Sequence, residues 1–278
     1  METTVLLDGG AFFEGPRWRA GRLWFSDMHG REVMTVDEAG KCETVNVVPN
    51  RPSGLGWLPG GELLVVSMTD RRLLRDEDGT LVEHADLSGF ADHECNDMVV
   101  DAEGRAYVGH FGFDHFSHAG FRPASLIAVE PDGEARVVAE DLMFPNGAVI
   151  ANGGSTLIVA ESYGRRLTAF DIRRDGSLDR RRIWAEIGMA PDGICLDAEG
   201  CIWVASPTER AVARIREGGA IADRLDLGRR AIACMLGGSD RQTLFVLTSE
   251  TTQPSRALEL RSARIETVRV DVPGDGRP

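Results

Sequence analysis

The chain has 278 residues, of which 42% are apolar and 27% charged, a composition ordinary for a soluble globular protein. Its net charge of −13 excludes a general DNA- or RNA-binding surface, which would need clustered Lys and Arg side chains. No stretch approaches the ~20 consecutive apolar residues of a membrane span, and the first residues lack the basic and apolar regions of a signal peptide. We therefore expect a cytoplasmic protein without nucleic-acid or membrane partners, present as a monomer or a small homo-oligomer.

One phrase recurs along the chain: a turn residue followed by a short strand of bulky and β-branched residues. Its six copies are GRLWFSD (21–27), GELLVVSM (61–68), GRAYVGH (104–110), STLIVAES (155–162), GCIWVAS (200–206) and QTLFVLTS (242–249). Matching residues in successive copies lie 41 to 51 residues apart, which is close to the length of one four-stranded propeller blade. The sequence therefore predicts an all-β fold, a six-bladed β-propeller with four-stranded antiparallel blades around a central channel.

Other strands flank each copy of the phrase. Asp-Gly turns separate the short apolar runs, and such turns favour hairpins because glycine adopts the positive φ that they require. No long window has the apolar period of a helix, so we expect almost no helix. We expect residues 1–278 to form a single propeller domain whose ring is closed by the strand Thr3–Leu7 joining the last blade, with a frayed tail at 273–278.

The five cysteines show no C-x-x-C pair, and their odd number argues against a full disulfide framework. Free cysteine is among the residue types most often buried in folded proteins. We therefore expect reduced thiols, most of them buried.

The segments that begin each blade are the candidates for chemistry, because the first strand of a propeller blade lines the central channel. Glu14, Asn146 and Asp192 each stand beside Gly and Pro, and Asn96 takes the equivalent place in its own segment. Apart from Arg51, these segments offer no Lys or Arg at the inner positions that would neutralise the two acids. Buried carboxylates are costly without a cation, and oxygen ligands favour a hard divalent ion. The pattern indicates one metal ion on the axis, while P-N-G and P-D-G taken singly are also good turn sequences.

Four short motifs, in this order and spacing, resemble the family of gluconolactonases, regucalcin (senescence marker protein) and luciferin-regenerating enzyme. They are E-G-P-R-W at 14–18, C-N-D at 95–97, F-P-N-G at 144–147 and P-D-G at 191–193. The resemblance covers about residues 12–272 and implies a six-bladed propeller with one divalent metal. It implies Glu14, Asn146 and Asp192 as metal ligands, Asp192 also as the general base, and Asn96 as a residue near metal and substrate. Ca²⁺ is the ion we expect first, with Mg²⁺, Mn²⁺ and Zn²⁺ as alternatives.

The activity that this resemblance implies is metal-dependent hydrolysis of a lactone or a small ester, in which the carbonyl is polarised and an activated water attacks it. The partner would be a small-molecule substrate. Two alternatives stay open: a non-catalytic regulatory propeller that binds a metal and a ligand, and a non-hydrolytic enzyme of a specialised pathway. The sequence has no G-x-S-x-G nucleophile elbow, no P-loop and no dinucleotide-binding fingerprint.

Glu94 departs from the family pattern, because sugar-lactonase members commonly carry an Arg two residues before the asparagine that Asn96 matches. The reversed charge argues against gluconolactone as the substrate. We predict Glu94 as a substrate contact, to a polyol, a cationic group or a second ion, with exposure to solvent as the alternative.

The segment 109–122 departs as well, since it holds three of the six His and four of the eleven Phe residues. We expect an aromatic lid over the channel mouth, with a loop packed over its own Phe residues as the alternative. The substrate contacts that we predict around it are His110, Phe111, Met143 and Phe144. A second metal site on its three His residues fits no common zinc spacing. The segment favours a substrate less polar than a sugar lactone.

Overall fold

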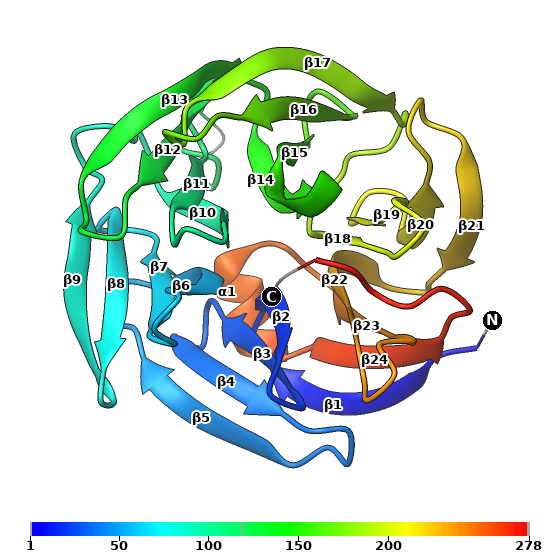
Figure 1. The fold of residues 1–278 in the computed structure, drawn as a ribbon. Coiled ribbons are helices and arrows are strands. Elements are labelled where there is room, and N and C mark those ends of the chain that lie inside the picture. Colours follow the sequence, from blue (N-terminus) through cyan, green and yellow to red (C-terminus); the bar gives the residue numbers. More distant parts are fainter. Residues whose placement is uncertain (1, 118, 277–278) are drawn as a thin grey trace.

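The computed structural model describes residues 2–117 and 119–276 and forms a ring of six four-stranded sheets around a central channel (Figure 1). Neighbouring strands within the sheets run antiparallel. The predicted six-bladed propeller is therefore confirmed. The matching residues of the recurring phrase, from Trp24 to Phe245, lie in the second strand of each blade, so the sequence repeat is also the structural repeat.

The first three blades follow the chain in order, from the inner strand outward. The first blade contains β2 (Phe13–Arg19), β3 (Arg22–Asp27), β4 (Glu32–Val36) and β5 (Cys42–Val47). The second contains β6 (Pro52–Trp57), β7 (Leu63–Ser67), β8 (Arg72–Glu77) and β9 (Thr80–Asp86). The third contains β10 (Cys95–Val100), β11 (Ala106–His110), β12 (Ala124–Val129) and β13 (Ala135–Leu142).

The other three blades complete the ring. The fourth contains β14 (Pro145–Ala151), β15 (Thr156–Glu161), β16 (Arg166–Ile172) and β17 (Leu178–Glu186), with a short 3-10 turn, η1 (Asn152–Gly154), after β14. The fifth contains β18 (Ile194–Leu196), β19 (Ile202–Ser206), β20 (Ala211–Ile215) and β21 (Ile221–Asp226). The sixth contains β22 (Arg230–Gly237), β23 (Thr243–Ser249), β24 (Ala263–Arg269) and the N-terminal β1 (Thr4–Gly10).

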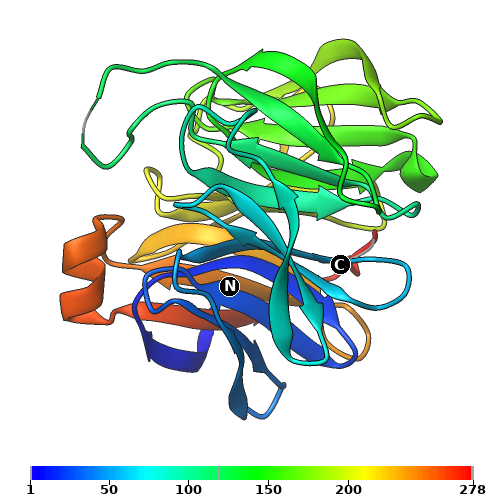
Figure 2. The same ribbon diagram turned by 90° about the vertical axis from the view of Figure 1, so that its left-hand side faces the viewer.

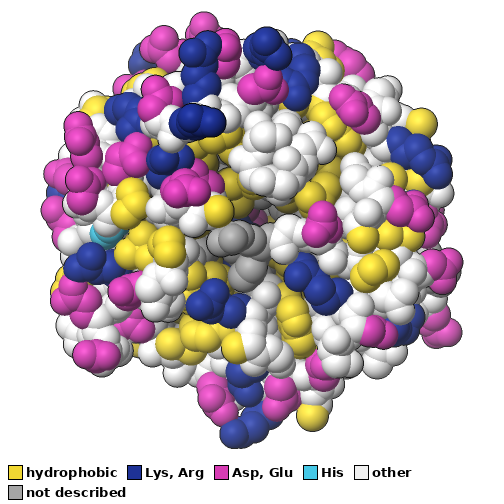
Figure 3. All heavy atoms as spheres, in the orientation of Figure 1, with side chains coloured by type: hydrophobic (Ala, Val, Ile, Leu, Met, Phe, Trp, Pro, Cys, Tyr) yellow, Lys and Arg dark blue, Asp and Glu magenta, His cyan; other side chains and the backbone are white. Residues whose placement is uncertain are grey.

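Two insertions project from one side of the ring. Figure 2 shows the helix α1 (Pro254–Leu260) on the same side as the described part of the segment between β11 and β12. The C-terminal tail lies on the opposite side. Figure 3 shows that opposite side, where acidic and basic side chains are interspersed around the rim of the ring. α1 has seven residues and is the longest helix that the structure describes, too short to cross a membrane.

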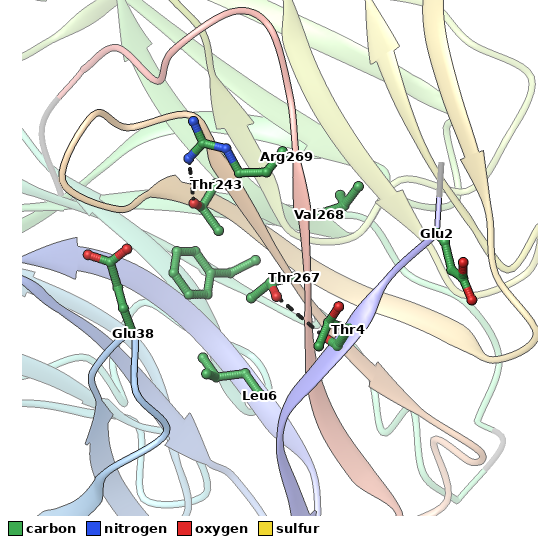
Figure 4. Close-up of a pocket in the computed structure, with 9 residues that line it drawn as sticks. Glu2, Thr4, Leu6, Glu38, Thr243, Thr267, Val268 and Arg269 are labelled. Atoms are coloured by element: carbon green, nitrogen blue, oxygen red, sulfur yellow. Dashed lines mark hydrogen bonds between the residues drawn. The ribbon is translucent and has the colours of Figure 1, made fainter.

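The ring is closed by pairing between its first and last strands, as predicted. β1 pairs with β24, from Thr4 opposite Thr267 to Gly10 opposite Ala263. The Thr267 hydroxyl also donates a hydrogen bond to the Thr4 carbonyl at 3.3 Å, beside a cavity of about 470 Å³ (Figure 4). This pairing covers sheet edges that would otherwise be left open.

The expectation of a frayed tail is wrong for residues 273–276. The carbonyl of Pro273 accepts a hydrogen bond from the Ala198 N–H at 2.9 Å, and the Asp275 N–H donates to the Leu196 carbonyl at 3.0 Å. The tail is therefore attached to the β18–β19 hairpin by backbone bonds, which a reading of its Pro and Gly content could not reveal. Residues 277–278 lie outside the described part of the chain.

Large side chains between the sheets form the core. Phe25, Tyr107, Trp203 and Phe245 are each less than 2% exposed. Burial of a large apolar side chain contributes about 1.5–3 kcal/mol to the free energy of unfolding. All five cysteines are free and four of them are buried, as predicted.

Candidate active site

The strand register places the predicted oxygen-bearing residues at equivalent positions. The inner-strand residues opposite the six matching residues of the phrase are Arg17, Leu55, Val99, Val149, Cys195 and Met235. Three residues before each of these stand, in turn, Glu14, Pro52, Asn96, Asn146, Asp192 and Ile232. Four separate blades thus contribute a carboxylate or an amide at one depth of the channel. We call Glu14, Asn96, Asn146 and Asp192 the axial oxygen cluster.

Interruptions of the strand ladder bring these side chains to the axis. The pairing of β2 with β3 is irregular between Glu14 and Arg17, and that of β14 with β15 between Pro145 and Ala148. In blade five, β18 begins only at Ile194, just after Asp192. A bulge of this kind bends the strand and changes the direction of a side chain. A polar residue at the bulge therefore need not follow the alternation of side chains between the two faces of the sheet.

The glycines that follow Asn146 and Asp192 allow the inner strands to approach closely. A Cβ atom at Gly193 would lie 2.4 Å from the Cβ of Ala233, and one at Gly147 would lie 2.7 Å from the Ile194 nitrogen. P-N-G and P-D-G are therefore not turns in this chain. Each motif leads into an inner strand, and its glycine stands where a Cβ atom would clash with the neighbouring strand.

Hydrogen bonds hold the amides of the cluster in place. The Asn96 side-chain N–H donates to Asn146 Oδ1 at 3.2 Å, and Asn146 Nδ2 donates to Ser162 Oγ at 3.2 Å. Ser162 Oγ in turn donates to the Pro191 carbonyl at 2.6 Å. The backbone N–H of Gly15 donates to Glu14 Oε2 at 3.0 Å. The bonds from Asn96 to Asn146 and from Ser162 to Pro191 connect blades three, four and five around the axis.

The two carboxylates of the cluster lie in an environment that disfavours their charge. Burial, followed by the charges of Asp192 and Asp97, raises the pKa of Glu14 well above its usual range. Burial also raises the pKa of Asp192 to about 8, with Asp97 adding to the rise and a hydrogen bond from Asn146 opposing it. The charge of Arg17 partly opposes the rise for Glu14, but neither carboxylate has an ion pair with a described basic residue.

Arg17 corrects the expectation that Arg51 alone could supply a positive charge at the inner positions. Its guanidinium is buried and lies 2.9 Å from Asp97 Oδ1 on β10. It also donates to the carbonyls of Pro16, at 2.8 Å, and of Met98. Arg17 occupies a register position that is apolar in the other blades. Its hydrogen bonds turn it toward Asp97, and the sequence offered no signal for this pairing.

A cavity of about 80 Å³ adjoins the cluster. Its described lining residues are Phe12, Glu14, Met28, His29, Asn96, Phe111, His115, Phe116, Phe144, Asn146, Asp192 and Thr252. All four members of the cluster are among them, as are the predicted contacts Phe111 and Phe144. The rest of the lining is mostly aromatic and comes from blade one, from the segment after β11 and from the approach to α1. Sequence analysis missed Phe12, Met28, His29 and Thr252.

Two stacked rings, Phe111 and Phe144, line this cavity, and Tyr163 stacks on Phe144 without being among the described lining residues. Phe111 stacks on Phe144 with ring centroids 4.8 Å apart, and Phe144 stacks on Tyr163 at 5.2 Å. We call these three rings the aromatic wall. His115 lies against it, 5.1 Å from the Phe144 ring, and its Nδ1 is 3.2 Å from the Tyr163 hydroxyl. Phe111, His115 and Phe116 of the Phe-rich segment thus line the cavity, whereas Phe113 and Phe121 are not among its described lining residues. A lid over the channel mouth stays a prediction.

His110 is not at the cavity. It is 1% exposed, and its Nδ1 accepts a hydrogen bond from the Gly112 N–H at 3.1 Å while Nε2 lies 2.9 Å from Ser125 Oγ. Burial lowers its pKa to about 4, so the ring is neutral at neutral pH. His110 therefore joins the two ends of the segment between β11 and β12. The second metal site considered for this segment also needs His118, which lies outside the described residues.

Glu94 and Met143 are likewise absent from the described lining. Glu94 Oε1 lies 3.5 Å from the guanidinium of Arg51, so a cation of the protein itself meets the carboxylate. Burial raises the pKa of Glu94, and Arg51 opposes that rise. Met143 contributes its backbone N–H, which donates to Glu161 Oε2 at 2.7 Å. Contacts of these two residues with a substrate stay predictions.

The axial cavity is smaller than several others. Cavities of about 470 Å³ beside β1 and 390 Å³ at the opposite mouth of the channel are lined by no member of the cluster. In the cavity beside β1, the acids Glu2 and Glu38 stand on opposite sides (Figure 4). Among residues 2–117 and 119–276, no three His, Cys, Asp or Glu side chains gather closely enough to hold a metal ion. The axial oxygen cluster has two such side chains, and its other two members are amides.

Comparison with known proteins agrees with the propeller fold and with the family resemblance of the sequence motifs. A family model described as SMP-30/Gluconolactonase/LRE-like region matches residues 12–250. A 6-deoxy-6-sulfogluconolactonase of Pseudomonas putida is 26% identical over 276 residues, which are 95% of this chain and 93% of that protein. A gluconolactonase structure from Xanthomonas campestris has a TM-score of 0.75 and 26% identity, covering 98% of this chain and 89% of its own. A calcium-binding regucalcin structure from Agrobacterium tumefaciens has a TM-score of 0.83 and 22% identity, and the match covers 100% of this chain and 96% of that one. This match shows a likeness of fold.

Proposed function

The chain belongs to the SMP-30/gluconolactonase/LRE-like family, and we propose that it is a lactonase-type hydrolase whose reaction takes place at the axial oxygen cluster. One observation carries the proposal: two carboxylates and two amides from four blades line a single cavity on the axis. The similarity to a sulfogluconolactonase and to a gluconolactonase supports ring opening of a lactone as the reaction class.

The cluster fits a divalent metal ion. Its donors are all oxygen atoms, which Ca²⁺ prefers, and two of its side chains are carboxylates without a basic partner among the described residues. Glu14, Asn146 and Asp192 would hold the ion, with Asn96 beside them. The similar protein from Agrobacterium is named as calcium-binding, which makes Ca²⁺ the first ion to test. When bound, the ion would polarise the ester carbonyl and stabilise the developing negative charge.

Asp192 is the residue that we expect to move protons. Its carboxylate lines the cavity and accepts a hydrogen bond from Asn146, which orients it. A bound cation would favour the ionised form of Asp192, whose pKa burial raises. In the proposed reaction its carboxylate oxygen takes a proton from a water molecule as the water oxygen bonds to the carbonyl carbon. The ring C–O bond of the lactone then breaks, and the alcohol oxygen receives the proton. Asn96 and Asn146 hold the polar end of the substrate.

The aromatic wall supports a substrate less polar than a sugar lactone. A flat apolar ring can pack against Phe111, and such aromatic contacts contribute about 0.5–1.5 kcal/mol beyond burial of area. Ligand pockets usually have volumes of about 300–1,000 Å³, so a cavity of about 80 Å³ must widen to admit a substrate. Phe111, His115 and Phe116 follow β11 outside any strand, so we expect these three lining side chains to move more readily than those on the inner strands.

Hydrolysis of a panel of lactones tests the proposal. We expect the purified protein, depleted of metal with a chelator and reloaded with Ca²⁺, to open the aryl lactone dihydrocoumarin faster than D-glucono-1,5-lactone. Asp192→Asn should lower kcat by about 10²–10⁴-fold, the range for removal of a general base. Glu209→Gln, an exposed acid on the β19–β20 turn, is the matched control and should retain full activity.

Three outcomes would count against the proposal in different ways. Full activity in Asp192→Asn would remove Asp192 from the mechanism. Failure to bind any divalent ion would remove the metal. Binding of Ca²⁺ without turnover of any lactone would favour the non-catalytic ligand-binding alternative instead.

A further inference from the structure

His29 is a polar side chain of the described cavity lining that belongs neither to the axial oxygen cluster nor to the aromatic wall. It follows β3 in the turn that leads to β4, and that turn is held firmly. The Asp27 carboxylate accepts hydrogen bonds from the N–H groups of Phe12, at 2.9 Å, and of Gly30, at 3.0 Å. The Met28 N–H donates to the Phe12 carbonyl at 2.8 Å. His29 is thus held next to the start of β2, the strand that carries Glu14.

The imidazole of His29 has no hydrogen-bond partner among the described residues. The residue is 4% exposed, and both ring nitrogens are buried without a partner. Its neighbours are apolar faces: the Phe12 ring lies 5.2 Å away and the Phe116 ring 6.2 Å away, between centroids. These rings fix the plane of the imidazole without satisfying either nitrogen.

A residue that served only packing would not need these nitrogens. Leaving a buried donor or acceptor unpaired costs about 1–3 kcal/mol, whereas a phenyl ring in such aromatic surroundings has no polar group to leave unpaired. His110 shows the contrasting case, because both of its nitrogens have partners where it joins the ends of a loop. Burial, aided by the charge of Arg51, lowers the pKa of His29 to about 4, so its ring is a neutral donor and acceptor at neutral pH.

We propose that His29 is a substrate-binding residue, whose imidazole donates a hydrogen bond to an oxygen atom of the bound lactone and so sets its orientation between the aromatic wall and the axial oxygen cluster. The inference rests on the proposed function for the identity of that ligand. The substrate it selects has a hydrogen-bond acceptor and a flat apolar ring within one small molecule. Because both ring nitrogens are buried, the proposal requires a neighbouring side chain such as Phe116, whose ring centroid lies 6.2 Å from that of His29, to shift when the substrate enters.

Two substitutions separate this role from a structural one. His29→Phe keeps a planar ring and removes both nitrogens, while His29→Gln keeps a donor and an acceptor. With dihydrocoumarin as the substrate, we expect kcat/KM to fall at least tenfold in His29→Phe, mainly through KM, and to recover in part in His29→Gln. The melting temperature of His29→Phe should be unchanged or higher, because no hydrogen bond within the protein is lost. His84→Phe, on the outer strand β9, is the matched control and should stay within twofold of the wild type.

A binding measurement judges the inference without relying on turnover. The probe is 3,4-dihydro-2-quinolinone, the lactam counterpart of dihydrocoumarin, titrated into protein labelled with ¹⁵N at its histidines. We expect the ring nitrogen signals of His29, assigned by their absence in His29→Phe, to shift on binding, while those of His84 do not.

The outcomes for the two proposals are distinguishable. If the wild type opened lactones but His29→Phe stayed within twofold of it, the inference on His29 would be wrong and the proposed function would stand. A melting temperature lowered by several degrees in both variants, with full activity, would assign His29 to packing. If no lactone were hydrolysed yet the His29 signals shifted with the lactam, the site would bind such ligands and only the proposed reaction would fail.

Discussion

Two layers of buried charged residues lie along the inner strands of the ring. They differ in whether the protein supplies a partner of opposite charge. In the layer of Arg17 and Asp97, the guanidinium and the carboxylate meet at 2.9 Å, and backbone groups satisfy the remaining hydrogen bonds. In the layer of the axial oxygen cluster, Glu14 and Asp192 have no such partner among the described residues. The first layer is complete as the chain folds, whereas in the second no described basic residue pairs with either carboxylate, and we propose that a cation from outside does so. Of the two layers, the incomplete one lines the cavity beside the aromatic wall, which is why we propose it as the functional one.

The largest effect that we expect comes from breaking the complete layer. Arg17→Met removes the cation and leaves Asp97 buried and unpaired, which should lower the free energy of unfolding by about 3–5 kcal/mol. The measurement is urea denaturation followed by tryptophan fluorescence. The double variant Arg17→Met with Asp97→Asn should recover most of the loss, since no unpaired charge remains. A loss below about 1 kcal/mol in the single variant would show that water reaches this layer and that the two layers do not differ.

The incomplete layer should respond in the opposite direction. Without metal, Asp192→Asn removes one of two neighbouring buried carboxylates and should raise the free energy of unfolding by about 1–3 kcal/mol at neutral pH. With Ca²⁺ at a hundred times its dissociation constant, the wild type should gain about 2.7 kcal/mol and the variant little. The order of the two melting temperatures would then reverse on adding Ca²⁺, as differential scanning calorimetry with and without EDTA can show. Equal responses in the two proteins would mean that Asp192 is not a ligand.

The repeat and the blade count could be predicted from the sequence because they rest on local patterns. The closure by β1 followed from the count, because one lone strand precedes the first full repeat and the ring must close. Strand length, Asp-Gly turns and spacing recur six times, and each copy supports the others. The cluster could be predicted for the same reason, since Glu14, Asn96, Asn146 and Asp192 occupy one position of the repeat. Their roles as ligands and base come from family resemblance and remain predictions.

The pairings across the ring could not be predicted, because they join residues far apart in the sequence. Arg17 meets Asp97 from another blade, and Arg51 meets Glu94 across two loops. His29 and His110 carry the same side chain and are both buried, yet one has no partner and the other joins two ends of a loop. Nothing in the local sequence of a histidine states which partners surround it, and this is why His110 was expected at the cavity and His29 was not.

The smallest effect that we expect concerns a third charged pair, which repeats the chemistry of Arg17 and Asp97 nearer to solvent. The side chains of Arg51 and Glu94 are 28% and 14% exposed, and their closest atoms are 3.5 Å apart. Such a pair contributes about 0.2–1 kcal/mol, so Glu94→Arg should lower the free energy of unfolding by about that amount through repulsion from Arg51. The charge swap Arg51→Glu with Glu94→Arg should restore it. Because Glu94 faces Arg51, we expect Glu94→Arg to change kcat/KM for D-glucono-1,5-lactone by less than threefold. A tenfold rise would instead place residue 94 in contact with the substrate and would make this pair a determinant of specificity.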